Sequence, residues 1–302
     1  MIKKALLGTV GLLAVLLLGA FGFAATEAAA FDSSLKKIYA VAAPPLSASS
    51  DSVLVARGKH LAESIGGCIG CHGPDLGGKP GKDMGPIGLL HAPNLTRGKG
   101  GVGSRYTDGQ LARLIRDGIK ADRRGVRFMP AQDMSWWPDE DVVAVISYVR
   151  SVPNVDHAAP NSTVGMLGKV LDRMDKLPLD IARRIDHTVK HASSLTPAPT
   201  AAYGQYLARL CTGCHGPTFS GGPIPGAPPS LPVPANITPD ASGIKHYEET
   251  DFMRFIATGV KPDGKQLDPF MPLQLLQNMN DTERRALFAY LTSLPARPFG
   301  GR

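Results

Sequence analysis

Cysteine is scarce in this sequence, with only four residues in a chain of 302. They form two Cys-x-x-Cys pairs 143 residues apart, whereas a disulfide scaffold packs more cysteines into a smaller chain. No segment shows a sustained two-residue alternation of apolar and polar side chains, and glycine and proline supply about a fifth of the residues. These features argue against disulfide-rich and sheet-based folds, and predict helices joined by long loops.

The chain also lacks a concentration of charge. Its net charge is +7 and its pI is near 9.3, but the basic residues are spread along the sequence without forming a run. A nucleic-acid-binding protein carries its basic residues on one face or in one segment. We therefore expect no nucleic-acid partner.

One long apolar run stands at the N-terminus. Residues 5–26 contain no charged side chain, which is enough to cross a bilayer as a helix, and the two preceding lysines predict that the following chain is exported. Small residues at 23–25 and 28–30 would also suit a signal peptidase. We expect residues 1–30 to be a retained membrane anchor, with a cleaved signal peptide as the alternative. The protein would lie on the periplasmic side of the bacterial inner membrane, or be soluble in the periplasm after cleavage.

The rest of the sequence is an internal repeat. Four segments recur in the same order, at an offset that stays within two residues over about 90 positions, so we predict a duplicated domain. The matching pairs are 58–73 with 204–216, 92–96 with 234–238, 111–120 with 252–261, and 128–153 with 270–295.

Within each copy the apolar spacing predicts helices. Apolar side chains recur at three- and four-residue steps in 111–119 and 252–256, and an acidic cluster precedes the last helix of each copy. We predict an all-α fold, in which each domain is a small bundle of three or four helices with long loops. The expected order is a linker at 31–50, domain 1 at 51–155, a partly helical connector at 156–200 that is broken at Pro178, and domain 2 at 201–297.

The chemistry of the chain lies in CIGCH and CTGCH. In a helical turn, two cysteines three residues apart lie on one face, so both sulfurs can reach the vinyl groups along one porphyrin edge. The adjoining histidine then points its ring at the iron, and this spacing is the attachment signature of c-type haem. We therefore predict two covalently attached c-type haems as cofactors. The residues are Cys68, Cys71 and His72 in the first copy, and Cys211, Cys214 and His215 in the second.

Two other uses of Cys-x-x-Cys are weaker. One structural zinc site would need both pairs to converge and would leave both histidines unused. A redox-active dithiol would be expected in a strand-then-helix context, which is absent here. The connector histidines His157, His187 and His191 are expected to face solvent and not to bind metal.

Two methionines are the predicted sixth ligands. Haem iron held by one histidine usually takes a second axial ligand, and a methionine thioether suits electron transfer. Met129 and Met271 each lie in Phe-Met-Pro, 57 and 56 residues beyond the motif histidines. We predict that these two bind iron.

The neighbouring methionines do not repeat in this way. Met134 corresponds to Leu276 in the second copy, so we expect Met134 and Met279 to be packing residues. Met84 and His91 are the weaker alternatives for the ligand of the first haem.

Each copy resembles a class I cytochrome c domain, and the whole chain resembles a diheme, membrane-associated bacterial cytochrome c. The matching features are Cys-x-x-Cys-His, an Asn-Leu/Ile-Thr turn, a Met-Pro loop and a last helix that ends at Ser-x-Pro. The resemblance implies that polar residues lie at the haem edge, although simple turn capping is an equal alternative for them. These residues are Asn94, Thr96, Asn236 and Thr238, with Tyr106 and Tyr247 as propionate donors. It also suggests Pro86 and Pro228 as the carbonyls that orient the histidines.

The expected function is electron transfer without catalysis. Both copies supply the same methionine, so neither iron is expected to have an open position. A diheme peroxidase, the alternative, needs such a position on one haem. The expected partners are redox proteins, namely a dehydrogenase, a quinol-oxidising complex, an oxidase or a reductase, together with the membrane if the N-terminal helix is uncleaved.

Overall fold

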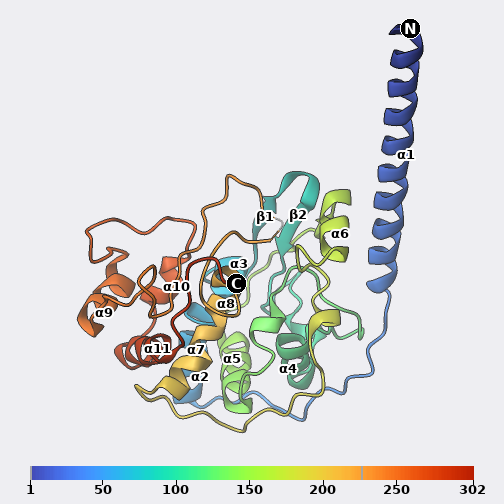
Figure 1. Cartoon of the computed structure of the whole chain (residues 1–302). Helices are drawn as coiled ribbons and strands as arrows, with labels where there is room; N and C mark the ends of the chain where they lie inside the picture. Colours follow the sequence, from blue (N-terminus) through green and yellow to red (C-terminus); the bar gives the residue numbers. More distant parts are fainter. Residues whose placement is uncertain (1, 226) are drawn as a thin grey trace.

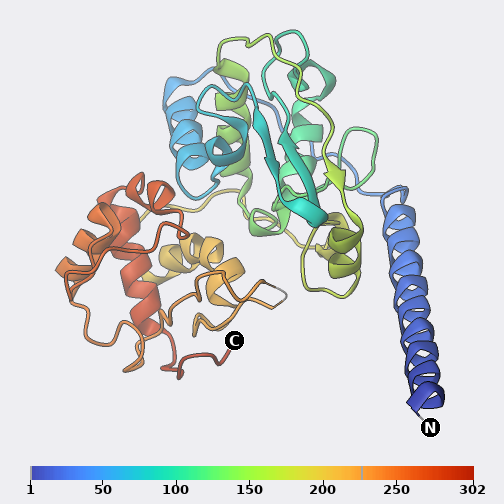
Figure 2. The same cartoon turned by 90° about the horizontal axis from the view of Figure 1, so that it is seen from above.

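The computed structural model describes residues 2–225 and 227–302 as two helical bodies and a long N-terminal helix that projects from them (Figure 1, Figure 2). This helix, α1 (Ile2–Ser34), contains the predicted membrane-spanning run and continues eight residues past it into the folded part of the chain. The predicted helical fold, with two domains behind an apolar helix, is confirmed.

The first body is built on two crossing helices. Helix α2 packs against α5, and Gly58 lies so close to α5 that a Cβ there would be 1.9 Å from the carbonyl oxygen of Ala144. Because only glycine permits this approach, the crossing depends on that residue. The helices of this body are α2 (Ser52–Glu63), α3 (Cys68–His72), α4 (Asp108–Asp117) and α5 (Asp139–Ser151), with a 3-10 turn η3 (Ala131–Asp133).

The second body repeats the same crossing. Helix α7 packs against α11, and a Cβ on Gly204 would again be 1.9 Å from a carbonyl oxygen, that of Ala286. The structure therefore reproduces the internal repeat at the level of helix packing. The helices are α7 (Ala201–Ala208), α8 (Thr212–His215), α9 (Glu249–Thr258), α10 (Leu273–Gln277) and α11 (Asp281–Ser293), with a 3-10 turn η5 (Arg209–Cys211).

A small antiparallel sheet in the first body was not predicted. Its strands are β1 (Lys79–Asp83), β2 (Gly88–Ala92) and β3 (Thr163–Val164), in the order β1-β2-β3. The strands are short and glycine-rich, so they carry no two-residue alternation. Since β3 belongs to the connector, this pairing attaches the connector to the first body.

The connector forms one helix, α6 (Met166–Arg173), followed by an irregular segment and a 3-10 turn η4 (Ala182–Arg184). Buried Asp172 organises the segment, because its carboxylate accepts hydrogen bonds from the backbone of Leu179 and Asp180 and pairs with Arg183 and Arg184. The predicted helical stretch thus ends five residues before Pro178.

All three connector histidines were predicted to face solvent, and for His187 this prediction is wrong. The ring of His187 lies within hydrogen-bonding distance of an Asp117 carboxylate oxygen (2.8 Å) and of the carbonyl oxygen of Ala182 (2.9 Å). It also stacks edge-on against Tyr39. The prediction missed these contacts because the linker and the connector meet only in the folded chain.

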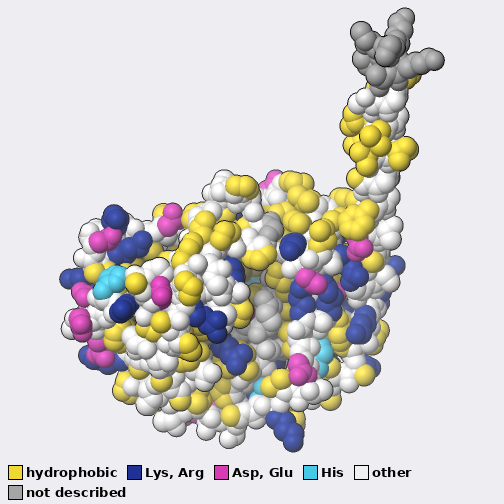
Figure 3. Space-filling view, in the orientation of Figure 1, with side chains coloured by type: hydrophobic (Ala, Val, Ile, Leu, Met, Phe, Trp, Pro, Cys, Tyr) yellow, Lys and Arg dark blue, Asp and Glu magenta, His cyan; other side chains and the backbone are white. Residues whose placement is uncertain are grey.

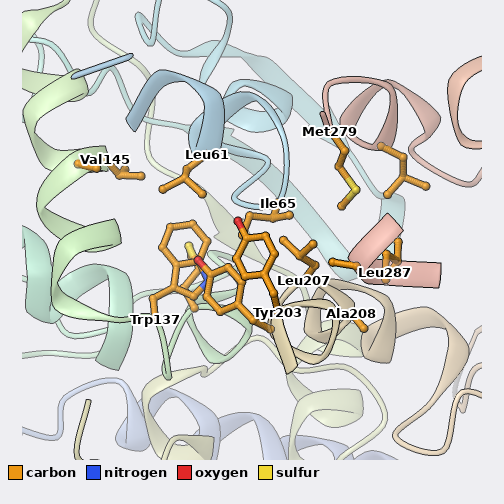
Figure 4. Packing of buried hydrophobic residues seen from close by; sticks show 14 of the residues in the cluster. Leu61, Ile65, Trp137, Val145, Tyr203, Leu207, Ala208, Met279 and Leu287 are labelled. Atoms are coloured by element: carbon orange, nitrogen blue, oxygen red, sulfur yellow. The ribbon is translucent and has the colours of Figure 1, made fainter. Parts of the chain in front are cut away.

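The two bodies share one hydrophobic cluster. Leu61, Trp137 and Val145 of the first body and Tyr203, Leu207 and Leu287 of the second belong to it (Figure 4). Removing these large apolar side chains from water on both sides of the boundary stabilises the pair as one unit.

Two of the polar contacts across the boundary lie at equivalent positions of the repeat. The Tyr206 hydroxyl donates to buried Asp141 at 2.6 Å, and the His60 ring lies 2.8 Å from the buried carboxylate of Glu283. Because His60 matches Tyr206 and Asp141 matches Glu283 in the repeat, the two contacts are reciprocal. The bodies are therefore related by an approximate two-fold symmetry.

The His60–Glu283 contact predicts a pH-dependent stability. The hydrogen bond that the His60 ring donates to the Glu283 carboxylate raises the pKa of His60, although burial opposes the shift. A raised folded-state pKa contributes stability that is complete below the ordinary pKa of about 6.5 and is lost as pH rises through the raised value. His60→Gln should therefore lower the free energy of unfolding by about 1–2 kcal/mol at mildly acidic pH and by less at alkaline pH.

The matched control is Tyr206→Phe, which removes the reciprocal contact. Burial and Asp141 raise the pKa of Tyr206 well above its ordinary value, so its effect should stay constant over the neutral to mildly alkaline range. Both effects are measured by thermal unfolding followed by circular dichroism. A His60→Gln effect that does not change with pH would contradict the assignment.

Candidate haem sites

The first motif forms a short helix between two glycines. Helix α3 contains Cys68 to His72; Gly67 before it and Gly73 after it have φ angles of 57° and 85°, which side chains other than glycine rarely adopt. The turn after the helix is closed by a hydrogen bond from the Gly78 amide to the His72 carbonyl. Both cysteines and the histidine are therefore held in one tight turn, as the attachment signature requires.

The second motif has the same arrangement, with a shorter segment between the preceding helix and the motif. Cys211 ends the turn η5, helix α8 contains Cys214 and His215, and Gly216 follows with a φ of 80°. The Gly221 amide closes the turn on the His215 carbonyl, as Gly78 does in the first copy. No disulfide joins the four cysteines, so all four sulfurs are available for thioether bonds to a porphyrin.

Each motif histidine is oriented by one backbone carbonyl. His72 Nδ1 lies 2.8 Å from the Pro93 carbonyl oxygen, and His215 Nδ1 lies 2.7 Å from that of Ala235. A hydrogen bond from Nδ1–H fixes the tautomer and leaves Nε2 available as a metal ligand. The residues present thus fit a haem iron on Nε2 of each ring.

The prediction of Pro86 and Pro228 as the orienting carbonyls is wrong. Pro86 lies instead in the turn between β1 and β2, where its carbonyl oxygen approaches Gly165 of the connector. Pro93 and Ala235 were overlooked although they are also 142 residues apart, and each directly precedes the repeated asparagine.

Burial keeps these groups uncharged. It lowers the pKa of His72 and His215, which favours the neutral imidazole that binds metals. It raises the pKa of the Cys68 thiol to about 11 and that of Cys211 to about 12. An apolar setting of this kind suits the edge of a porphyrin.

The repeated asparagines and threonines are buried and bind backbone. The Asn94 amide donates to the carbonyls of Val155 and His157, and the amide of Thr96 donates to Asn94 Oδ1. They attach the chain that follows the last helix to the segment that orients the motif histidine.

The second copy does the same. The Asn236 amide donates to the Arg297 carbonyl at 2.7 Å, and Asn236 Oδ1 accepts from the backbone and hydroxyl groups of Thr238. These contacts support the backbone role that turn capping implied; a contact of these residues with haem stays a prediction.

The two Phe-Met-Pro turns agree from the methionine onwards, whereas before it Phe128 has a φ of 66° that Phe270 does not share. A hydrogen bond links the Ala131 amide to the Met129 carbonyl at 2.8 Å, and another links the Leu273 amide to the Met271 carbonyl at 2.7 Å. The following prolines have φ and ψ of −79° and 57° in the first copy and −76° and 66° in the second. Met129 and Met271 are both half-buried against the shared hydrophobic cluster.

The remaining methionines behave as expected where the structure tests them. Met134 and Met279 are buried members of the core, which confirms their packing role. Met84 lines a cavity of about 240 Å³ together with Phe128 and Pro130, on either side of Met129. His91 lies in β2, with its ring over Gly81 of β1. These positions leave Met84 and His91 as the weaker alternatives.

Tyr106 and Tyr247 are half-buried at equivalent positions before α4 and α9. Burial raises the pKa of both hydroxyls, so each is a neutral donor at physiological pH. Their assignment as propionate donors stays a prediction.

A shared zinc site finds no support. Within residues 2–225 and 227–302, no three or more His, Cys, Asp or Glu side chains come together in a way that could hold a metal ion. The two motifs lie in different bodies, each with its own histidine.

Comparison with known proteins supports this assignment. A model of the cytochrome c family matches residues 55–153 and 201–295. The fructose dehydrogenase cytochrome subunit of Gluconobacter japonicus is 27% identical over 291 residues, covering 85% of this chain and 56% of that protein.

Two further relatives match one domain. The gluconate 2-dehydrogenase cytochrome c subunit of Pantoea cypripedii is 37% identical over 94 residues, covering 29% of this chain and 21% of that protein. The alcohol dehydrogenase (quinone) cytochrome c subunit of Gluconobacter oxydans is 34% identical over 94 residues, covering 29% and 20%. The chain thus spans about half the length of the first relative and about a fifth of the other two. These relatives give the peroxidase alternative no support.

The asparagine contacts predict a stability effect. Asn236→Ala leaves the backbone amide of buried Thr238 without its partner and removes one donor to the Arg297 carbonyl, so it should lower the free energy of unfolding by about 1–3 kcal/mol. Ser242→Ala, which removes one exposed partner of the Asn236 side-chain amide, should change it by much less. Thermal unfolding of the haem-loaded protein measures both. If Asn236→Ala kept the stability and shifted only the reduction potential of one haem, the backbone role would be wrong.

Proposed function

The chain belongs to the cytochrome c family, and on that basis we propose that it is the electron-transfer subunit or partner of a periplasmic dehydrogenase. Its two cytochrome c domains bind two covalently attached c-type haems, and the chain transfers electrons without being catalytic itself. When bound, each haem supplies a one-electron Fe(III)/Fe(II) couple.

The proposed sites follow the repeat. Cys68 and Cys71 would hold the first haem covalently, and Cys211 and Cys214 the second, in domains at 51–155 and 201–297. The axial ligands would be His72 with Met129 and His215 with Met271. Asn94, Thr96, Asn236, Thr238, Tyr106 and Tyr247 complete the two sites, with the first four acting through the backbone.

The observation that carries the proposal is the equality of the two Met-Pro turns. The hydrogen bond from the second residue after each methionine and the angles of the proline agree closely, which supports a methionine ligand in both copies. A peroxidase needs one haem whose sixth position can open for peroxide, and that requires unequal sites. Two equal histidine and methionine sets serve electron transfer, because methionine raises the reduction potential and leaves no position for substrate.

A dehydrogenase is the proposed donor. The relatives are cytochrome subunits of fructose, gluconate and alcohol dehydrogenases, and one of them covers both domains of this chain. The chain would then accept electrons one at a time from such an enzyme and pass them to a further acceptor.

The docking of α1 supports a retained anchor. Ala28 and Phe31 are buried against the body, and Glu27 and Asp32 form ion pairs with Arg173 and Lys169 of α6. Both small-residue sites that could suit a signal peptidase lie inside this continuous helix. We place the two domains on the periplasmic side of the inner membrane, attached through α1.

The ligand assignment is tested by substitution. Met129→Ala and Met271→Ala should each lower the reduction potential of one haem and let carbon monoxide bind that haem in the reduced protein, while the haem content stays at two per chain. Met134→Leu, a core substitution of similar volume, should do neither. Rapid binding of carbon monoxide by the unaltered protein, with turnover of hydrogen peroxide, would contradict the carrier function.

Whether the N-terminal segment is retained is tested by measuring the mass of the purified protein. The protein purified from its native membrane should retain residues 5–30 in intact mass spectrometry and should need detergent for release. A mature protein that begins after residue 25 or residue 30 and is released by salt alone would show that the segment is a cleaved signal.

A further inference from the structure

The part of helix α1 that projects from the body is about as long as the hydrocarbon core of a bilayer is thick. From Leu7 to Phe23 its side chains are exposed, and Ala24 is the first that the body partly covers. The uncharged residues 5–23 therefore give about 28 Å of free helix at 1.5 Å per residue. A bilayer has a hydrocarbon core of about 30 Å. No stalk remains between the membrane and the body.

Helix α6 shows which part of the body lies at that level. It runs antiparallel to α1, because Lys169 pairs with Asp32 at 2.6 Å while Arg173 pairs with Glu27 at 3.3 Å. The C-terminal end of α6 therefore points towards the free part of α1. The turn that follows carries Met174, a large apolar side chain that is 49% exposed.

Two further segments reach the same side of the body. The turn between β1 and β2, residues 84–87, packs against α6. Part of the loop between α8 and α9 rises in the direction in which α1 extends (Figure 1). The first part of this loop, residues 216–239, has no charged side chain, and Val233 in it is 52% exposed. The space-filling view shows hydrophobic side chains along this edge, with few charged ones (Figure 3).

We propose that this face rests in the headgroup region of the bilayer that α1 spans. The membrane-facing surface comprises Met174, residues 84–87, and residues 223–225 and 227–234. The proposal rests on the retained anchor proposed above. Lipid is the occupant because the free length of α1 leaves the body no distance from the membrane, and because the face presents apolar side chains where the interface accepts them.

This contact would orient the first haem site with respect to the membrane. The turn at Met174 continues into the segment that covers the first Met-Pro turn, where the Phe128 amide donates to the Leu179 carbonyl and residues 127 and 180 pair as a β-bridge. In the second copy the equivalent Phe270 is 42% exposed. The first Met-Pro turn would thus be fixed near the bilayer, and the second would stay open to soluble partners.

The proposal is tested with spin labels on the full, haem-loaded chain. Haem attachment consumes all four natural cysteines, so a single introduced cysteine is labelled uniquely. Met174→Cys and Val233→Cys report on the proposed face. Leu16→Cys reports on insertion of α1, and Val53→Cys reports on an exposed apolar position of α2, at the opposite end of the body (Figure 1).

The protein is reconstituted in vesicles of phosphatidylethanolamine and phosphatidylglycerol, with the haems reduced so that low-spin iron does not relax the label. The accessibility of each label to oxygen, which partitions into lipid, is compared with its accessibility to a water-soluble nickel chelate. We expect the oxygen-to-nickel ratio at positions 174 and 233 to exceed that at position 53 several-fold, and position 16 to show the largest ratio.

Other outcomes overturn the proposal in distinguishable ways. If position 16 is in lipid while 174 and 233 are in water, the body does not rest on the membrane, although the anchor stands. If position 16 is also in water, the anchor fails and the proposed face fails with it. Labels at 174 and 233 shielded from both reagents would mean that protein, and not lipid, covers the face. A lipid signal at position 53 would mean non-specific adsorption.

Discussion

The hydrogen bond between each motif histidine and a backbone carbonyl is the contact around which each domain is arranged. A histidine can present Nε2 to iron only if Nδ1 holds its proton and its direction, and Pro93 and Ala235 supply the acceptor at 2.8 and 2.7 Å. The acceptor must itself be fixed. The next residue, Asn94 or Asn236, does this by binding the chain beyond the last helix. The turn that holds the motif histidine, the asparagine turn and the chain after the last helix therefore depend on one another.

The contacts between the two domains also depend on one another. Because duplication places a tyrosine or histidine and a carboxylate at matching positions, each domain can offer one donor and one acceptor across the boundary. The buried carboxylates also lie in the first turn of α5 and α11, where the helix dipole favours negative charge. A shared hydrophobic cluster then joins the two domains into one body. The distance and orientation between the two sites are therefore fixed by the contacts between the domains.

The asymmetry of the molecule comes from the segments outside the repeat, namely the connector and helix α1. The connector supplies β3 to the sheet and docks α6 on α1, and its irregular segment covers the first Met-Pro turn. In the second copy the equivalent Phe270 is exposed. Two sites of similar chemistry are thereby given different surroundings, one beside the anchor and one facing away from it.

Local pattern was enough to predict the helical class, the duplication, the helical turn at each Cys-x-x-Cys-His motif, and the packing role of Met134 and Met279. These depend on spacing along the chain, and comparison of the two copies makes that spacing visible. The carbonyls of Pro93 and Ala235 could not be read from residue type, because any residue offers a carbonyl and only the folded loop decides which one meets the ring. The sheet, the contacts of His187 and the reciprocal bonds at Asp141 and Glu283 join segments far apart in sequence. Such contacts leave no periodic signal, so only the tertiary structure decided them.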